Sequence, residues 1–357
     1  MDYHNLILQQ LDQLDLDQLY QIAGRIENDT GLHGLTNLRE LVIQILQGEL
    51  PWNWDLMMHQ GFKLFFSQLQ NSISSCIMIL LVCILSGLMT NLTESFGKHT
   101  VSKVGSVICI LVAATVSAKD FMEVYHYCLQ QMDLMIIAVQ SLFPVLIPLI
   151  LASGKAVTGT LLNPAMLSVI TMIATVMDRW ILPGIFISCA LCIVGGMIDQ
   201  SFLHRGGKLF KDVIVFSLGM TVTVLSAFTT IQSTVGKTAD SLIMKTARYS
   251  VDNFIPMIGG FAADSMDMVI SCTGMIKNAI GLWGVILLFL LLLFPLIKMA
   301  SIILVYRCGA VLAEALEDKT IASCLDDIAS AITTLAVVYM LMGILFIVFL
   351  TILIAVI

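Results

Sequence analysis

Residues 282–305 read LWGVILLFLLLLFPLIKMASIILV, and this stretch decides the fold class. Its 24 residues include one charge, Lys298, toward the carboxyl-terminal end. A helix needs about 20 mostly apolar residues to cross the hydrocarbon core of a bilayer. A lysine near the end of such a helix can extend its long stem to the headgroups, and we expect Lys298 to do so. The stretch therefore predicts a transmembrane helix.

The composition of the whole chain agrees with this prediction. Of 357 residues, 58% are hydrophobic and only 12% are charged, and the mean hydropathy is +0.94. A soluble domain is about half apolar and a quarter charged, so lipid must be the solvent for most of this chain. The formal net charge of -7 argues against nucleic acid as a partner, because binding phosphates requires a basic surface.

Working outward from residues 282–305, seven other apolar runs resemble membrane spans. They are residues 74–92, 104–118, 134–152, 161–177, 181–198, 213–231 and 333–357. The second and fourth of these eight spans are short, and they could be packed inside the bundle. Residues 71–357 are therefore predicted to form an all-α, polytopic integral membrane bundle of about eight spans.

The first seventy residues have a different pattern. Leu8, Leu11, Leu19, Ile22 and Ile26 recur at near-helical spacing among polar residues, and a second such run ends at Gly48 before Pro51. Trp52 and Trp54 follow, and indole rings favour the headgroup zone. Residues 1–70 are therefore expected to form an amphipathic, partly interfacial helical region. Residues 1–10 do not resemble a secretory signal, because they lack a basic start and an apolar core.

Lysine and arginine favour one set of connections between the spans. With the amino terminus outside, the first, third, fifth and seventh connections face the cytoplasm, as the positive-inside rule requires. They hold Lys98, Lys103, Lys155, Arg205, Lys208, Lys211, Lys298, Arg307 and Lys319. Either the natural start then lies further upstream, or the amino-terminal region stays inside and the number of spans is odd.

Helix breakers occur inside several spans. They are Pro144, Pro148, Asn163, Pro164, Pro183 and Pro295. Proline removes a backbone donor and clashes with the preceding turn. Two interpretations remain open: discontinuous helices around a permeation path, or simple kinks in continuous helices.

Residues 232–281 are expected to form a long loop with a possible re-entrant hairpin, because Pro256, Gly259 and Gly260 interrupt its apolar parts. Asp264 and Asp267 are three residues apart, so they share one face of any helix. These carboxylates could line a cation path or bind a partner. The alternative is a surface hairpin with both carboxylates in water.

No motif in the sequence favours catalysis. The chain has no Gly-x-x-x-x-Gly-Lys-[Ser/Thr] phosphate loop and no His-Glu-x-x-His motif, and its six histidines lie in tails and loops. Cys189 and Cys192 have redox or zinc spacing, but in an apolar run they are more readily explained as packing residues. We therefore expect no enzymatic activity, no metal and no cofactor.

The long connection resembles the signature region of the stage III sporulation protein AE family. The resemblance is carried by Phe254-Ile255-Pro256-x-Ile258-Gly259-Gly260, Asp264-x-x-Asp267-x-Val269-Ile270-x-Cys272 and Lys277-Asn278-Ala279-x-Gly281. Leu162-Asn163-Pro164 and the overall plan of an amphipathic start followed by a multi-span bundle are similar to that family as well.

The resemblance implies a multi-pass subunit of the complex that joins mother cell and forespore during endospore formation. It places the chain in the mother-cell membrane around the forespore, within a complex that resembles a secretion apparatus. The implied partners are the lipid bilayer, the other stage III A proteins (an ATPase and ring-forming subunits) and, indirectly, the forespore protein stage II Q. A homo-oligomer is also possible.

The expected function is that of a channel or export-gate subunit. The candidate gate, pore or partner site comprises Phe254, Pro256, Gly259, Gly260, Asp264, Asp267 and Lys277. A free-standing secondary transporter and a non-conducting membrane scaffold are the alternatives.

Overall fold

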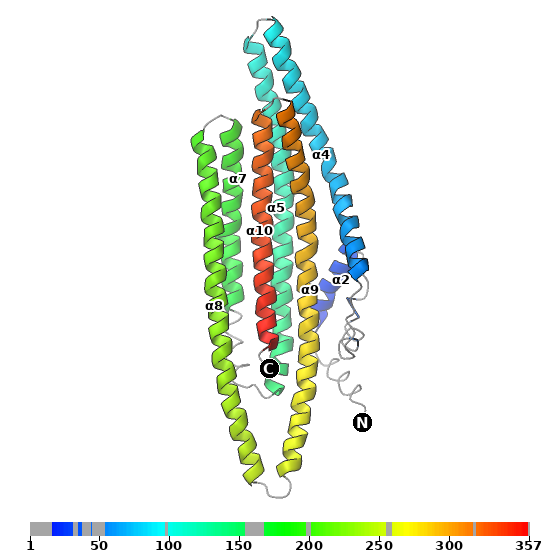
Figure 1. Cartoon of the computed structure of the whole chain (residues 1–357), viewed down its shortest axis with the longest axis vertical. Coiled ribbons are helices and arrows are strands. Elements are labelled where there is room, and N and C mark those ends of the chain that lie inside the picture. The colour runs from blue at the N-terminus through cyan, green and yellow to red at the C-terminus, as the bar shows by residue number, and fades with distance from the viewer. Residues whose placement is uncertain are drawn as a thin grey trace.

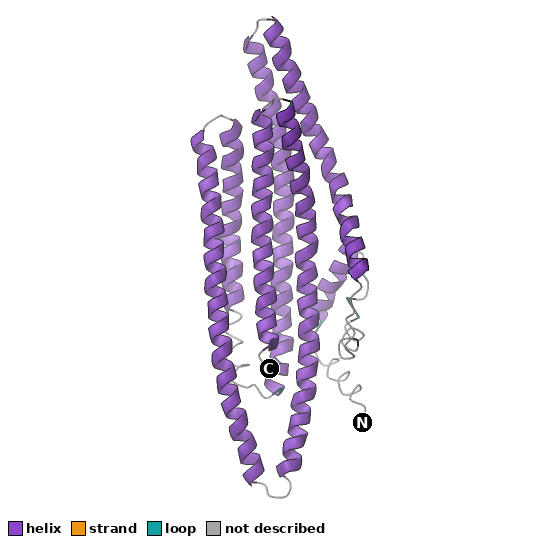
Figure 2. Ribbon diagram, viewed as in Figure 1, coloured by secondary structure: helices purple, strands orange, loops and turns teal. Residues whose placement is uncertain are grey.

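The computed structural model describes residues 16–30, 35–37, 44, 54–96, 99–153, 168–197, 201–254, 259–316 and 319–355. All regular elements among these residues are helices, which confirms the predicted all-α class (Figure 2). The helices are α2 (Asp17–Thr30), α4 (Trp54–Phe96), α5 (His99–Ala152), α7 (Leu182–Met197), α8 (Ser201–Phe254), α9 (Gly259–Ala315) and α10 (Lys319–Ala355). A π-helical turn, η1 (Met177–Ile181), precedes α7.

The long helices run roughly along the longest axis of the molecule (Figure 1). Helix α10 contacts α9 on one side and the α7–α8 pair on another, and α5 also packs against it. Helix α4 lies along α9 and α5. The adjoining ends of α4 and α5, of α7 and α8, and of α9 and α10 all lie toward the same end of the molecule, whereas α8 and α9 approach each other at the opposite end.

Four helices in the described part of the chain are long and apolar enough to cross a membrane. They cover Val107–Ala152, Ser168–Gly195, Ile270–Ala315 and Lys319–Ile354. The prediction of about eight spans is therefore not confirmed. The expected spans 104–118 and 134–152 both belong to α5, and residues 168–197 are helical without a break, although they include parts of two expected spans.

Residues 119–133 of α5 explain this difference in span number. Their charges suggested a connection, but the segment contains no glycine or proline to end a helix. Phe121, Val124, Cys128 and Met132 recur every three to four residues and are buried. The segment is therefore an amphipathic helical stretch whose buried face continues the core.

The prolines in the described spans do not end their helices. Helix α5 continues past Pro144 and Pro148, and α9 continues past Pro295. Pro183 is the second residue of α7 and lies just after η1, where the N–H of Leu182 bonds to the carbonyl of Met177, five residues earlier. Such a wide turn accommodates a residue that cannot donate to the ladder. Asn163 and Pro164 lie outside the described residues.

The segment 232–281 is not a loop in its described part. Helix α8 continues to Phe254 and α9 begins at Gly259, and the two helices extend beyond α7 and α10 at that end of the molecule (Figure 1). Residues 232–253 contain one glycine and no proline, so nothing in them stops α8. The expected re-entrant break falls on residues 255–258, which lie outside the described residues.

The amphipathic helix α2 packs on the bundle. Its apolar stripe, including Leu19, Ile22 and Ile26, is buried, and α2 contacts α5 and α9. The hydroxyl of Ser141 on α5 donates to Gln18 Oε1 at 2.7 Å. The apolar face of α2 is thus covered by the protein itself. Helix α4 continues through residue 70, at which the amino-terminal region was expected to end.

Candidate functional site

A polar stripe on α10 faces the α7–α8 pair. Asp327, Ser330, Ala331 and Thr334 are spaced at i, i+3, i+4 and i+7, so they share one face of the helix, and all four line a cavity between α10, α7 and α8. Asp327 is only 8% exposed. Polar side chains in an otherwise apolar helix are costly in lipid unless they face the interior of the bundle.

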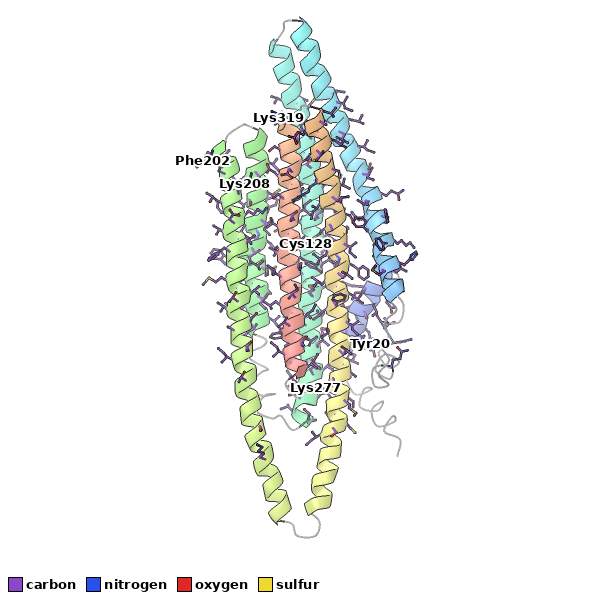
Figure 3. All side chains as sticks on the ribbon, viewed as in Figure 1. Tyr20, Cys128, Phe202, Lys208, Lys277 and Lys319 are labelled. Carbon is purple, nitrogen blue, oxygen red and sulfur yellow. The ribbon has the colours of Figure 1, made fainter. Side chains whose placement is uncertain are left out.

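Helix α8 supplies the charged side chains opposite this stripe. Lys208, Lys211 and Asp212 line the cavity, and Figure 3 shows Lys208 close to the end at which α7 and α8 meet. Apolar residues of the same helix are exposed, including Phe202 at 83% and Phe216 at 74%. Charges toward the protein and apolar side chains toward the surroundings are the arrangement expected of a helix with a lipid-facing side.

Helix α7 completes the wall of the cavity. It contributes Ile185, Ser188, Cys189 and Cys192, and the cavity has a volume of about 200 Å³. The two cysteines that were predicted to be packing residues are buried free thiols at this wall. No group of three or more His, Cys, Asp or Glu side chains in the described ranges is arranged to hold a metal ion.

Hydrogen bonds between side chains and neighbouring helices join α7, α8 and α10 around the cavity. The ammonium of Lys211 donates to Ser330 Oγ at 2.6 Å and thereby links α8 to α10. The hydroxyl of Ser188 donates to the carbonyl of Gly207 at 2.7 Å and links α7 to α8. A Cβ atom at Gly207 would lie 2.5 Å from Cys192 Sγ and 3.0 Å from the carbonyl oxygen of Ser188, so glycine permits the close approach of α7 and α8.

Lys277, one of the predicted site residues, lies elsewhere, near the end of α10 (Figure 3). Its side chain is fully buried, and its ammonium donates to the backbone carbonyl of Ile354 at 2.9 Å. Ile354 is in the last turn of α10, where carbonyls have no partner within the helix and the helix dipole is negative. Lys277 therefore caps α10 from α9.

Comparison with known proteins adds the family. A profile described as Stage III sporulation protein AE matches residues 36–356. The chain belongs to the stage III sporulation protein AE family. The sequence is also 26% identical over 293 residues to the protein named Stage III sporulation protein AE of Bacillus subtilis (strain 168), covering 82% of this chain and 73% of that relative. No solved structure matches this chain.

The other predicted site residues of this member of the AE family are only partly placed by the structure. Phe254 ends α8, and Gly259 and Gly260 begin α9. Asp264 and Asp267 lie in the first turns of α9. Asp267 lies ten residues before Lys277 on α9, which is about 15 Å along the helix axis. The helix therefore does not bring these two residues next to each other. Pro256 lies outside the described residues, and the side chains of the other five are not described.

The polar cavity of this AE-family chain was missed by sequence reasoning. Lys208 and Lys211 were assigned to a connection, where the positive-inside rule accounts for them, and Asp327 fell in the connection before the last span. The available signal was the spacing of Asp327, Ser330 and Thr334, which places three polar side chains on one face of α10.

Lys298 also has a specific contact. Its ammonium lies 3.9 Å from the centroid of the Tyr127 ring on α5, a cation–π arrangement. This contact joins α9 to α5 within the long helices.

Proposed function

We propose that this chain is a gate-like, membrane-embedded subunit of the stage III sporulation complex, in the mother-cell membrane around the forespore. The family supports a role in sporulation. Four long apolar helices support a multi-pass position in a membrane. The partners in this proposal are the other stage III A proteins, with an ATPase and ring-forming subunits, and the forespore protein stage II Q.

The observation that carries the gating proposal is the polar cavity between α7, α8 and α10. A purely structural bundle in lipid has little reason to place Lys211 and Asp327 at a cavity, because intramembrane charges are costly and mark substrate or ion paths in membrane proteins. In this proposal the Lys211–Ser330 hydrogen bond holds α8 against α10 in the closed state. Movement of α8 away from α10 breaks that bond and widens the cavity.

The α8–α9 end of the molecule has a second role in the proposal. The two helices extend past the rest of the bundle there, and the predicted site residues Phe254, Pro256, Gly259, Gly260, Asp264 and Asp267 all belong to this segment. We assign this end to partner contact rather than to the gate, since the cavity lies toward the other end of α8.

The test uses a spore-forming host in which the variant chain replaces its own AE-family protein. Lys211→Met and Asp327→Asn change the cavity, and Lys319→Met and Asp326→Asn are matched controls, because Lys319 is an exposed residue of α10 that does not line the cavity and Asp326 is exposed beside Asp327. We expect each cavity variant to lower the number of heat-resistant spores at least tenfold. Protein level and co-purification with the complex should be unchanged, and the controls should sporulate normally.

Three outcomes would contradict the gating proposal. Normal sporulation of both cavity variants would remove the cavity from the mechanism. Loss of co-purification in step with loss of spores would favour the scaffold alternative. Solute uptake by vesicles that contain this chain alone would instead favour a free-standing transporter.

A further inference from the structure

The charges around the cavity are balanced in sign. Lys208 and Lys211 contribute two positive groups, and Asp212 and Asp327 contribute two negative groups. Lys208 and Asp212 are four residues apart on α8 and therefore share a face of that helix. Both are exposed, whereas Lys211 is half-buried and Asp327 is buried. Each sign of charge thus occurs both at the accessible edge of the cavity and deeper inside it.

The cavity has room for a small organic molecule. Its volume of about 200 Å³ is below the roughly 300–1,000 Å³ of pockets that hold drug-sized ligands, so it suits a smaller molecule. Ile185 and Ala331 provide apolar patches, and the hydroxyls of Ser330 and Thr334 add polar groups. A few precisely placed polar groups on a partly apolar wall are typical of a small-molecule site.

The balance of charge discriminates between classes of ligand. A simple anion would be attracted by the lysines and repelled by Asp327. A simple cation would be attracted by Asp327 and repelled by the lysines. Binding either one deep in the cavity brings its charge close to a lining group of the same sign, which is unfavourable. A molecule with both an anionic and a cationic group can complement both pairs.

We propose that this cavity binds a small zwitterion in which a carboxylate or phosphate lies a few bonds from a primary ammonium. The anionic group binds toward Lys208 and Lys211, and the ammonium binds toward Asp327 and Asp212. The inference rests on the proposed function, because it identifies the ligand of the same cavity. A free amino acid and the phosphoethanolamine headgroup of a lipid share this chemistry.

Four probes separate the classes of ligand. The full chain, purified in detergent, is titrated with glycine, phosphoethanolamine, acetate and ethylamine while binding heat and thermal unfolding are measured. We expect glycine or phosphoethanolamine to bind and to raise the unfolding temperature, and acetate and ethylamine at equal concentration to do neither. Preference for glycine identifies a soluble amino acid as the source, and preference for phosphoethanolamine identifies a lipid headgroup.

Variants tie the binding to the cavity. Lys208→Met and Asp327→Asn each remove one charge, and we expect each to weaken binding of the preferred zwitterion about tenfold or more, as loss of a charge-assisted hydrogen bond does. Lys208 is exposed, so its variant is expected to fold even if Asp327→Asn does not. Lys319→Met and Asp326→Asn should bind as the natural chain does.

The results distinguish this inference from the gating proposal. The inference is overturned if neither zwitterion binds, or if acetate binds as tightly as the zwitterions do. Either result overturns it even if the cavity variants still impair sporulation. Zwitterion binding that is lost in Lys208→Met and Asp327→Asn upholds the inference. If the cavity variants nevertheless sporulate normally, the inference still stands and only the gating proposal fails.

Discussion

The two sides of α10 differ in how closely they are packed and in where their polar groups lie. Toward α9, α10 is closely packed: Gly343 receives the side chain of Leu292, and the hydroxyl of the fully buried Tyr339 donates to the carbonyl of Leu291. Toward α7 and α8, α10 presents Asp327 and its polar neighbours to a cavity. One helix therefore separates a closed seam from an open polar space.

This difference shows that a buried charge does not by itself mark a functional site. Lys277 is more deeply buried than Lys211, yet its ammonium binds a helix end that would otherwise carry unpaired carbonyls. Lys211 instead bonds to a side chain at the edge of a cavity. The partner of the charge, rather than its depth, separates the structural lysine from the candidate functional one.

The largest expected effect comes from reversing the charge on the closed side. Lys277→Glu places a carboxylate beside the carbonyl of Ile354 in a fully buried position, and we expect a loss of more than about 3 kcal/mol in stability, since an unpaired buried charge costs about that much. The measurement is the yield and the thermal unfolding of monodisperse protein in detergent.

The control for this prediction is the next residue. Asn278 is exposed, and Asn278→Glu adds the same charge outside the seam, so it should unfold close to the natural chain. Equal unfolding temperatures for Lys277→Glu and Asn278→Glu would show that the cap on α10 contributes little to stability.

The second prediction concerns the close approach of α9 and α10. A Cβ atom at Gly281 would overlap the side chain of Ile354, whereas a Cβ at Gly274 would meet nothing within 4 Å. Gly281→Ala is therefore expected to destabilise the chain by about 1–3 kcal/mol through overpacking. Gly274→Ala should stabilise it by up to about 1 kcal/mol, because alanine is the better helix former. Thermal unfolding of both variants in the same detergent shows whether each is more or less stable than the natural chain. If both were more stable, the side chain of Ile354 would not lie against Gly281.

The sequence predicted the all-α class because runs such as residues 282–305 are long and apolar enough to form membrane-spanning helices, and this signal does not depend on tertiary contacts. It did not give the number of spans. The charges of residues 119–133 suggested a connection, while the buried series Phe121, Val124, Cys128 and Met132 continues α5 through them. Charge indicates exposure to water, but helix continuity is decided by the absence of breakers and by the spacing of apolar residues.

The candidate site was harder to predict, because it is assembled from three helices that are distant in sequence. Lys211 and Ser330 are 119 residues apart, and only the packing of α8 against α10 brings them together. Conversely, the motif that contains Lys277 and Gly281 was recognised as a signature, and the structure accounts for these two residues by the α9–α10 seam. A sequence signature can therefore record packing as readily as chemistry.

The third prediction moves to the cavity side. Gly207→Ala introduces a Cβ against Cys192 and the backbone of Ser188, while Gly206→Ala meets nothing within 4 Å. We expect Gly207→Ala to destabilise the α7–α8 contact by about 1–2 kcal/mol and to increase the reactivity of the buried Cys189 thiol toward a maleimide. Gly206→Ala should leave both properties unchanged. Unaltered maleimide labelling in Gly207→Ala would mean that α7 and α8 can separate without opening the cavity wall.

The smallest effect is expected at a polar contact that lies outside the cavity. The hydroxyl of Tyr306 on α9 donates to Asp120 Oδ2 on α5 at 2.7 Å, and Tyr306 is buried. Tyr306→Phe should lower stability by about 0.5–1.5 kcal/mol, the net contribution of a typical intramolecular hydrogen bond.

Tyr125→Phe is the matched control for the Tyr306 prediction, because it retains the ring that packs with Phe121 and Phe186 and should change stability by less than about 0.5 kcal/mol. Both variants should sporulate normally, since neither touches the cavity. Suppose instead that Tyr306→Phe impaired sporulation while its stability changed by less than about 0.5 kcal/mol. A polar group away from the cavity, at the contact between α9 and α5, would then also take part in function. The distinction between the two sides of α10 would then not be the one that separates structural from functional charges.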